Sequence, residues 1–215
     1  MSAAHGLAVG VDVAARRGCD VVMLDAALVA HPVGRVHTAD ELRALLERLA
    51  PAVVAIDAPP GWASPGRARA CERALAAHGV SVFTTPDAAR GETSAFYDWM
   101  RTGFTMFAGA AAHPTLETFP HAVAIALRGG PPEHGLLKHP AAKKAWRRAA
   151  LDAAGVDHSA LRTIDEIDAA LCAITGRRFL EGRTVELGDP SEGVLTVPVG
   201  LPERRAPRGS TTRTR

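Results

Sequence analysis

Two aspartates each follow a short apolar run, and they are the residues best suited to carry chemistry. Asp12 lies in the phrase GVDV and Asp57 in the phrase AIDAPPGW. Neither apolar run alternates with polar residues, which is typical of a strand buried on both faces. Two carboxylates held close together repel each other and are costly to desolvate, so such a pair indicates a bound proton or cation. A hard divalent metal, Mg²⁺ or Mn²⁺, is the natural candidate.

Further acids occur where other elements are predicted to begin or end. Asp165 and Asp168 lie near the start of a predicted helix whose first residues, TIDE, form a capping box. Glu117 lies in a possible short strand, TLETF, and is a candidate metal ligand or water-orienting base. Each acid alone is more often a cap, a turn residue or an ion-pair partner. Together, carboxylates from separate elements suit two-metal phosphoryl chemistry.

The spacing of apolar residues predicts elements that could bring these acids together. Strands are predicted at 7–13, 19–25, 27–33 and 52–57, with a helix from the capping box at 38–41 to Pro51. A strand, helix and strand of this length normally form a right-handed parallel crossover, which would lay Asp57 beside Asp12. Helices are also predicted at 67–77, 91–108, 121–127, 141–154 and from 164 onward, and a hairpin at 183–188 and 193–199.

Several basic and aromatic residues are candidates for substrate binding. Arg69 and Arg73 lie one turn apart on the predicted helix 67–77 and could hold a phosphate, although an ordinary exposed helix face explains them equally well. Trp62 follows Asp57 in a loop and is a candidate pocket wall. Lys138 is retained as a further substrate-binding candidate.

Other signals favour structural interpretations. Lys138 begins a basic strip for which a solvated face is favoured; its other members are Lys143, Lys144, Arg147 and Arg148. The aromatic segment 96–107 is better explained by packing than by base stacking. Of the histidines, only His121 is kept as a weak catalytic candidate, because of its closeness in sequence to Glu117.

Composition narrows the class of protein. The chain has 215 residues, enough for one domain at 1–201, and the Arg-rich segment 202–215 is expected to be a disordered tail. The tail carries five arginines and one glutamate, so residues 1–201 have a net charge of −2, which argues against a broad basic nucleic-acid platform.

Missing motifs exclude further classes. The sequence has neither GxxxxGK[ST] nor GxGxxG after a strand, and its three cysteines form no CxxC pair. Dedicated NTPase, dinucleotide and thiolate-zinc chemistry are therefore not expected. The sequence also has no run of about 18 apolar residues and no basic flank of a secretory signal, so a cytoplasmic location is expected.

The chain also resembles a known family. The phrases GVDV, AIDAPPGW, RACER, VFTTP, ETFPH, DEIDAALCA and VELGDPSEGVLTVP resemble, in this order, the domain of unknown function 429 family across about residues 7–199. This resemblance implies an α/β, RNase H-like fold with a mixed central sheet flanked by helices and an added C-terminal hairpin. It also implies nuclease activity and four metal ligands, Asp12, Asp57, Asp165 and Asp168.

Two functional hypotheses follow. In the first, the protein is a metal-dependent nuclease or phosphodiesterase in which Asp12, Asp57, Glu117 and Asp168 are catalytic and nucleic acid or a nucleotide is the substrate. In the second, the same fold is a noncatalytic module that binds a nucleotide, a small ligand or a protein partner, which the weakly acidic core favours. A kinase or ATPase of the same superfamily is a third idea, but the length leaves little room for a second lobe.

Overall fold

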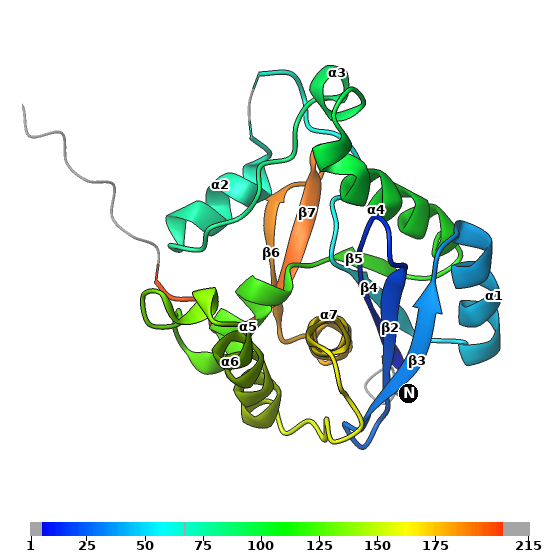
Figure 1. The fold of residues 1–215 in the computed structure, drawn as a ribbon, viewed down its shortest axis with the longest axis vertical. Helices are drawn as coiled ribbons and strands as arrows, with labels where there is room; N and C mark the ends of the chain where they lie inside the picture. Colours follow the sequence, from blue (N-terminus) through cyan, green and yellow to red (C-terminus); the bar gives the residue numbers. More distant parts are fainter. Residues whose placement is uncertain (1–5, 67, 204–215) are drawn as a thin grey trace, which may run out of the picture.

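The structure is a computed structural model that describes residues 6–66 and 68–203. Within these residues, seven strands form one sheet in the order β3-β2-β1-β4-β5-β7-β6 (Figure 1). The strands are β1 (Ala8–Asp12), β2 (Cys19–Leu24), β3 (Ala30–Val36), β4 (Val53–Ile56), β5 (Thr115–Glu117), β6 (Thr184–Asp189) and β7 (Gly193–Pro198). β1, β4, β5 and β7 run parallel, whereas β2, β3 and β6 pair antiparallel with their neighbours. The carboxyl ends of β1, β4 and β5 therefore meet at one edge of the sheet.

Helices cover both faces of this sheet. They are α1 (Ala39–Leu49), α2 (Ala70–Ala77), α3 (Ala88–Gly91), α4 (Asp98–Gly109), α5 (Pro120–Arg128), α6 (Pro140–Ala153) and α7 (Ile164–Leu180), with short 3-10 turns η2 (Ala95–Tyr97) and η3 (Leu136–Lys138). α7 packs on β1, β2 and β4, with α5 and α6 beyond it, while α1 and α4 lie on the opposite face (Figure 1). The sheet is thus one layer of a three-layer α/β arrangement.

Local sequence explains where the first crossover begins and ends. The Thr38 hydroxyl accepts a hydrogen bond from the Glu41 backbone N–H at 3.1 Å, which caps α1. α1 ends at Ala50 in the left-handed conformation, directly before Pro51. Leu42 and Leu46 face the core of this side, which also contains Val9 and Ile56 from β1 and β4. The crossover therefore delivers β4 parallel to β1.

α7 differs from the expected amphipathic helix because it is buried on all sides over most of its length. Every residue from Ile167 to Arg177 is buried. One side contacts the sheet, and the others contact α5 and α6. This position explains the run of small side chains in its middle, because larger ones would hold α7 away from the strands.

Several predicted bounds needed correction. The helix predicted over 91–108 is instead η2 followed by α4, and the separate short helix α3 ends at Gly91. The strand predicted at 27–33 is displaced to Ala30–Val36, and the helix predicted at 67–77 begins at Ala70. The hairpin lies where the turn sequence GDPSEG predicts it, as β6 and β7.

The predicted α/β architecture is confirmed: the described residues form a mixed sheet flanked by helices, with an added C-terminal hairpin. Cys19, Cys71 and Cys172 are buried as free thiols. Of the expected tail, residues 204–215 lie outside the described residues. None of the helices in the described ranges is both long and apolar enough to cross a membrane.

Candidate metal centre

The carboxyl ends of β1 and β4 bring Asp12 and Asp57 together. Val11 of β1 pairs with Ile56 of β4, and the Asp57 backbone N–H donates to the Val11 carbonyl at 3.0 Å. Asp12 is the last residue of β1 and is 8% exposed, whereas Asp57 directly follows β4. The predicted juxtaposition of these two strand ends is present in the structure.

The first two turns of α7 add Asp165 and Asp168 to the same place, where their charges raise the pKa of Asp12. Gly10 in β1 explains how close α7 comes, because a Cβ atom at this position would lie 1.9 Å from the Ala169 carbonyl oxygen. Only a residue without a side chain permits this approach of backbone to backbone. Asp165 and Asp168 are 8% and 9% exposed. Glycine in the strand therefore helps to position the acids of the helix.

The acids influence one another electrostatically. Burial raises the pKa of Asp12 well above its ordinary value, and the charges of Asp57, Asp168 and Asp165 raise this pKa further. Burial, followed by the charge of Asp168, raises the pKa of Asp57 to about 8. Burial also raises the pKa of Asp168, against the opposing charges of Arg147 and Lys143. A cation or proton placed among these carboxylates therefore stabilises the cluster.

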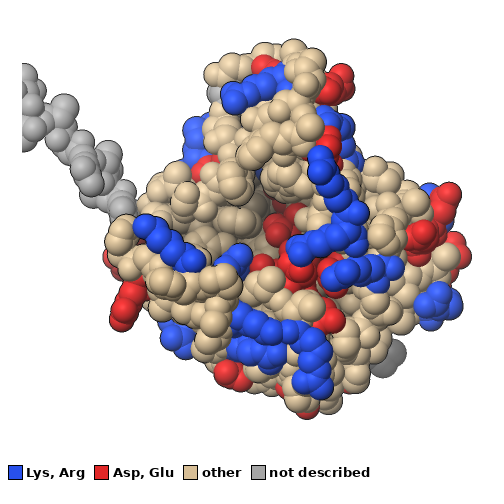
Figure 2. Space-filling model, in the orientation of Figure 1, with Lys and Arg blue, Asp and Glu red and all other residues tan. Residues whose placement is uncertain are grey.

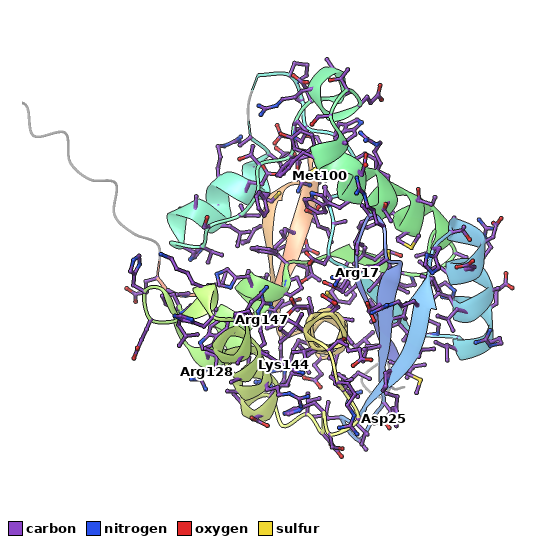
Figure 3. All side chains as sticks on the ribbon, viewed as in Figure 1. Arg17, Asp25, Met100, Arg128, Lys144 and Arg147 are labelled. Carbon is purple, nitrogen blue, oxygen red and sulfur yellow. The ribbon has the colours of Figure 1, made fainter. Side chains whose placement is uncertain are left out.

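Two arginines partly balance this negative charge. An Arg147 Nη1 lies 2.8 Å from Asp168 Oδ1, and Arg147 is only 5% exposed. An Arg17 Nη2 donates to Asp165 Oδ1 at 2.6 Å from the turn between β1 and β2. Arg147 approaches from α6 on one side of α7, and Arg17 approaches from the other (Figure 3). Acidic side chains lie in the hollow at the centre of this face, with basic side chains around it (Figure 2).

Arg147 is a site residue that the sequence analysis missed. The basic strip that contains it was expected to be a solvated face, but Arg147 is buried and Lys143 is half-buried. The signal was present in the helical spacing: Arg147 falls on the same side of α6 as the buried residues Ala150 and Leu151. A charged residue within an apolar stripe indicates a buried partner.

The hydrogen bonding of this pair is incomplete. Among the described residues, neither Nε nor Nη1 of Arg147 has a hydrogen-bond partner of good geometry, and the same is true of Asp168 Oδ1. The contact between them is therefore mainly electrostatic. Buried polar atoms that lack hydrogen-bond partners can bind a new ligand without first losing a hydrogen bond.

Glu117 and Arg69 form a separate buried network beside Asp57. Arg69 donates to both Glu117 oxygens, at 2.8 Å and 2.5 Å, and its Nε donates to Glu72 at 3.2 Å. Burial raises the pKa of Glu117, and Arg69 opposes this effect. Arg69 was predicted to bind a substrate phosphate, but its guanidinium is 4% exposed and is directed at carboxylates. In the structure it is the counter-ion of Glu117.

The other predicted substrate-binding residues lie apart from the acids. Arg73 is exposed and donates to the Ala68 carbonyl, and Lys138 is exposed in η3. The Trp62 ring packs edge-on against Phe104, with ring centroids 4.7 Å apart. Trp62 thus anchors the start of the loop after Asp57 to α4.

His121 lies nearer to the acids and their counter-ions. Its ring packs between those of Phe119 and Trp146, at centroid distances of 5.9 Å and 5.8 Å. Burial and the charges of Arg147 and Lys143 lower the pKa of His121 to about 4. The imidazole is therefore neutral at physiological pH.

A cavity of about 220 Å³ adjoins Asp57 and Glu117. Its lining is largely apolar and includes three aromatic side chains, those of Phe83, Trp99 and Phe119. Phe83 is 65% exposed. This cavity was not predicted from the sequence, because its walls come from the segment before α3, from α4, and from strands far apart in the chain.

The donor set of the centre suits a hard divalent cation, since all four acids offer carboxylate oxygens. The side chains are not arranged as a preformed metal site: within residues 6–66 and 68–203, no group of three or more His, Cys, Asp or Glu side chains is placed to hold a metal ion. Arg147 instead lies against Asp168.

The chain is similar to a protein family and to solved structures of another protein. A family model described as "Protein of unknown function (DUF429)" matches residues 10–193. A structure of RuvC from Thermus thermophilus is 18% identical with a TM-score of 0.43, covering 82% of this chain and 96% of that one. A T. thermophilus RuvC in complex with a Holliday junction substrate is 15% identical with a TM-score of 0.46, covering 83% and 96%. No curated protein matches the chain significantly.

Proposed function

The chain belongs to the DUF429 family of proteins of unknown function, and from its acid cluster we propose that it hydrolyses phosphodiesters in nucleic acid or nucleotides with the help of Mg²⁺ or Mn²⁺. One observation carries this proposal. Asp12 ends β1 and Asp57 follows the adjacent parallel strand β4, close to Asp168, and burial together with the charges of neighbouring acids raises the pKa of both. Holding buried carboxylates this close together lowers the stability of the folded protein unless a cation or proton binds to them.

Asp12, Asp57, Asp165 and Asp168 would hold the cation. When bound, a divalent ion in such a site supplies an activated water and neutralises the charge on phosphate oxygens. Asp57 lies at the junction of the cluster, the Arg69–Glu117 pair and the cavity. Asp57 would therefore contact both the metal and the substrate. Glu117, held by both bonds from Arg69, would orient water or complete the site from β5.

Lys143 and Arg147 are the best-placed cations for the substrate phosphate. Both are close enough to oppose the raised pKa of Asp57 and Asp168. Arg147 also has unbonded donor atoms in the described structure. A guanidinium can bind a phosphate through two parallel hydrogen bonds, so Arg147 can exchange its carboxylate partner for a phosphate.

The proposal is tested by a double substitution, Asp12→Asn with Asp57→Asn. Mn²⁺-dependent hydrolysis of a panel of single-stranded DNA, RNA and a small phosphodiester should fall at least about a hundredfold, because two of the four carboxylate ligands are lost. Asp40→Asn is the matched control, since Asp40 is an exposed acid on α1 with a side chain 85% exposed. A double variant that hydrolyses as fast as the control would remove the proposal.

A second candidate function is a noncatalytic module that binds a nucleotide, a small ligand or a protein. The pairs Arg17–Asp165 and Arg147–Asp168 favour it, since two of the four acids already have cationic partners. Calorimetric titration with Mn²⁺ separates the two functions. Binding that is lost in Asp57→Asn supports the metal-dependent function, and no binding by the unsubstituted protein supports the module.

A further inference from the structure

The cavity beside Asp57 has polar groups that are already committed to one another. Arg69 and Glu117 form a two-bond ion pair in which each side chain is 4% exposed. The Thr118 hydroxyl donates to the Thr196 carbonyl at 2.9 Å. These groups leave little charge to attract a phosphate or to satisfy a sugar. The lining therefore favours a neutral group with apolar faces.

The size of the cavity limits what can enter. Its volume is about 220 Å³, below the roughly 300–1,000 Å³ of sites that enclose a whole small molecule. The cavity also opens beside an acid of the proposed metal centre. It therefore suits one part of a larger ligand whose remainder lies over the carboxylates.

The aromatic side chains indicate the shape of that part. Phe83 lies in the irregular segment before α3 and is 65% exposed, which leaves a large apolar face available to a ligand. Its ring contacts the Phe96 ring at a centroid distance of 6.0 Å. Trp99, on α4, is half-buried and also lines the cavity. Proteins use such exposed rings to stack the flat faces of nucleic-acid bases.

We propose that this cavity binds the base of an unpaired nucleotide whose adjacent phosphodiester lies at the carboxylates. The identity of the ligand rests on the proposed function, because a base is the neutral aromatic group nearest to a phosphodiester in a nucleic acid. A base inside a duplex is stacked and paired and must leave the helix before it can enter a pocket. The substrate class is thus single-stranded or locally unpaired nucleic acid.

Binding is measured by fluorescence anisotropy in Mn²⁺, on proteins that carry Asp12→Asn to prevent hydrolysis. The probes are a short labelled single strand, the same strand with abasic positions, and its blunt duplex. Phe83→Ala should weaken binding of the intact strand about tenfold, as expected for loss of one base–aromatic stack. It should leave binding of the abasic strand unchanged, since the two changes remove the same contact. Val199→Ala is the control, because Val199 is 61% exposed and does not line the cavity.

The outcomes separate this inference from the proposed function when hydrolysis by the protein with native Asp12 is assayed in parallel. Equal loss of intact and abasic strand binding in Phe83→Ala, equal binding of duplex and single strand, or no binding at all would overturn the base site. Hydrolysis without base-dependent binding would support the phosphodiesterase function and contradict the base site. Base-dependent binding without hydrolysis would leave only the base site.

Discussion

Arg147 and the four aspartates act as one charge system at the end of the β1–β4 pair. Asp168 is buried against Arg147, and the charge of Arg147 also opposes the raised pKa of Asp57. A guanidinium in this position supplies part of the positive charge that a divalent ion would otherwise supply. Metal binding and the Arg147–Asp168 contact are therefore expected to compete.

Arg147→Gln tests this competition. In EDTA the variant should be destabilised by about 3 kcal/mol, because it leaves a buried carboxylate without its cation. Its affinity for Mn²⁺ should rise about tenfold, since the ion no longer displaces a charge. Urea unfolding and calorimetry measure the two effects, with Arg128→Gln on the exposed end of α5 as the control. A variant whose Mn²⁺ affinity equals that of the control contradicts the prediction.

The raised pKa of Asp57 predicts how stability depends on pH without metal. Between the ordinary carboxyl pKa of about 4 and the folded value of about 8, the folded protein binds a proton that the unfolded chain has lost. The free energy of unfolding should therefore fall as pH rises through this range, by at most about 1.4 kcal/mol per pH unit for each such proton.

Urea unfolding in EDTA across this range measures the slope. Asp57→Asn should reduce it without abolishing it, because Asp12 also has a raised pKa. Saturating Mn²⁺ should likewise flatten the profile, since the cation replaces the proton. Stability that rises with pH in the metal-free protein would contradict the raised pKa of Asp57 and Asp12.

At the level of elements, the spacing between β1 and α7 depends on Gly10. A Cβ atom there would meet the backbone of Ala169, so α7 would have to shift. Gly10→Ala should cost about 3 kcal/mol or more, at the upper end of overpacking effects. It should also weaken Mn²⁺ binding, since Asp165 and Asp168 would move with the helix.

Gly61→Ala is the control for this substitution, because a Cβ atom at Gly61 meets nothing within 4 Å. Thermal unfolding and calorimetric titration of both variants test the prediction. A Gly10→Ala protein with the stability and Mn²⁺ affinity of Gly61→Ala would show that the helix position tolerates the added methyl group.

Most elements could be predicted from sequence because their signals are local. The capping boxes at Thr38 and Thr163 mark where α1 and α7 begin, and the unbroken apolar runs before Asp12 and Asp57 mark buried strands. The interruption of the helix expected at 91–108 could not be predicted in this way. At Gly91 an added Cβ atom would meet the Trp62 ring at 2.5 Å, a contact between segments distant in sequence. Tertiary contacts, and not helix propensity, therefore determine the structure of that region.

The same distinction applies to the candidate site. The four aspartates could be predicted from strand ends, helix spacing and family resemblance. The partners of Arg69 and Arg147 could not, because their ion pairs join residues from separate elements. The identity of a basic residue does not show whether it faces solvent or a buried acid. Its position relative to the apolar face of the helix does. For Arg147 that position would have been sufficient.

Over the whole molecule, the charge pattern predicts a limited electrostatic contribution to nucleic-acid binding. Acids lie in the central hollow, and the basic side chains surround it without forming a continuous track on this face (Figure 2). For single strands, the logarithm of affinity falls with the logarithm of salt concentration by about 0.7 for each phosphate contacted. Lys143→Gln should therefore reduce the slope by about 0.7 relative to Arg128→Gln. Identical slopes would place Lys143 outside the phosphate path.

α7 is both the most deeply buried helix and the source of two of the four acids. A nascent chain that has not yet released this helix has Asp12 and Asp57 but lacks Asp165 and Asp168, two of the four acids proposed to hold the cation, and the helix that packs against Gly10. Under the proposed function, all four acids could contact the ion only after α7 has docked on the sheet. Binding of Mn²⁺ would then report that α7 has docked, and chelation should lower the thermal stability of the folded protein by the free energy that the ion contributes.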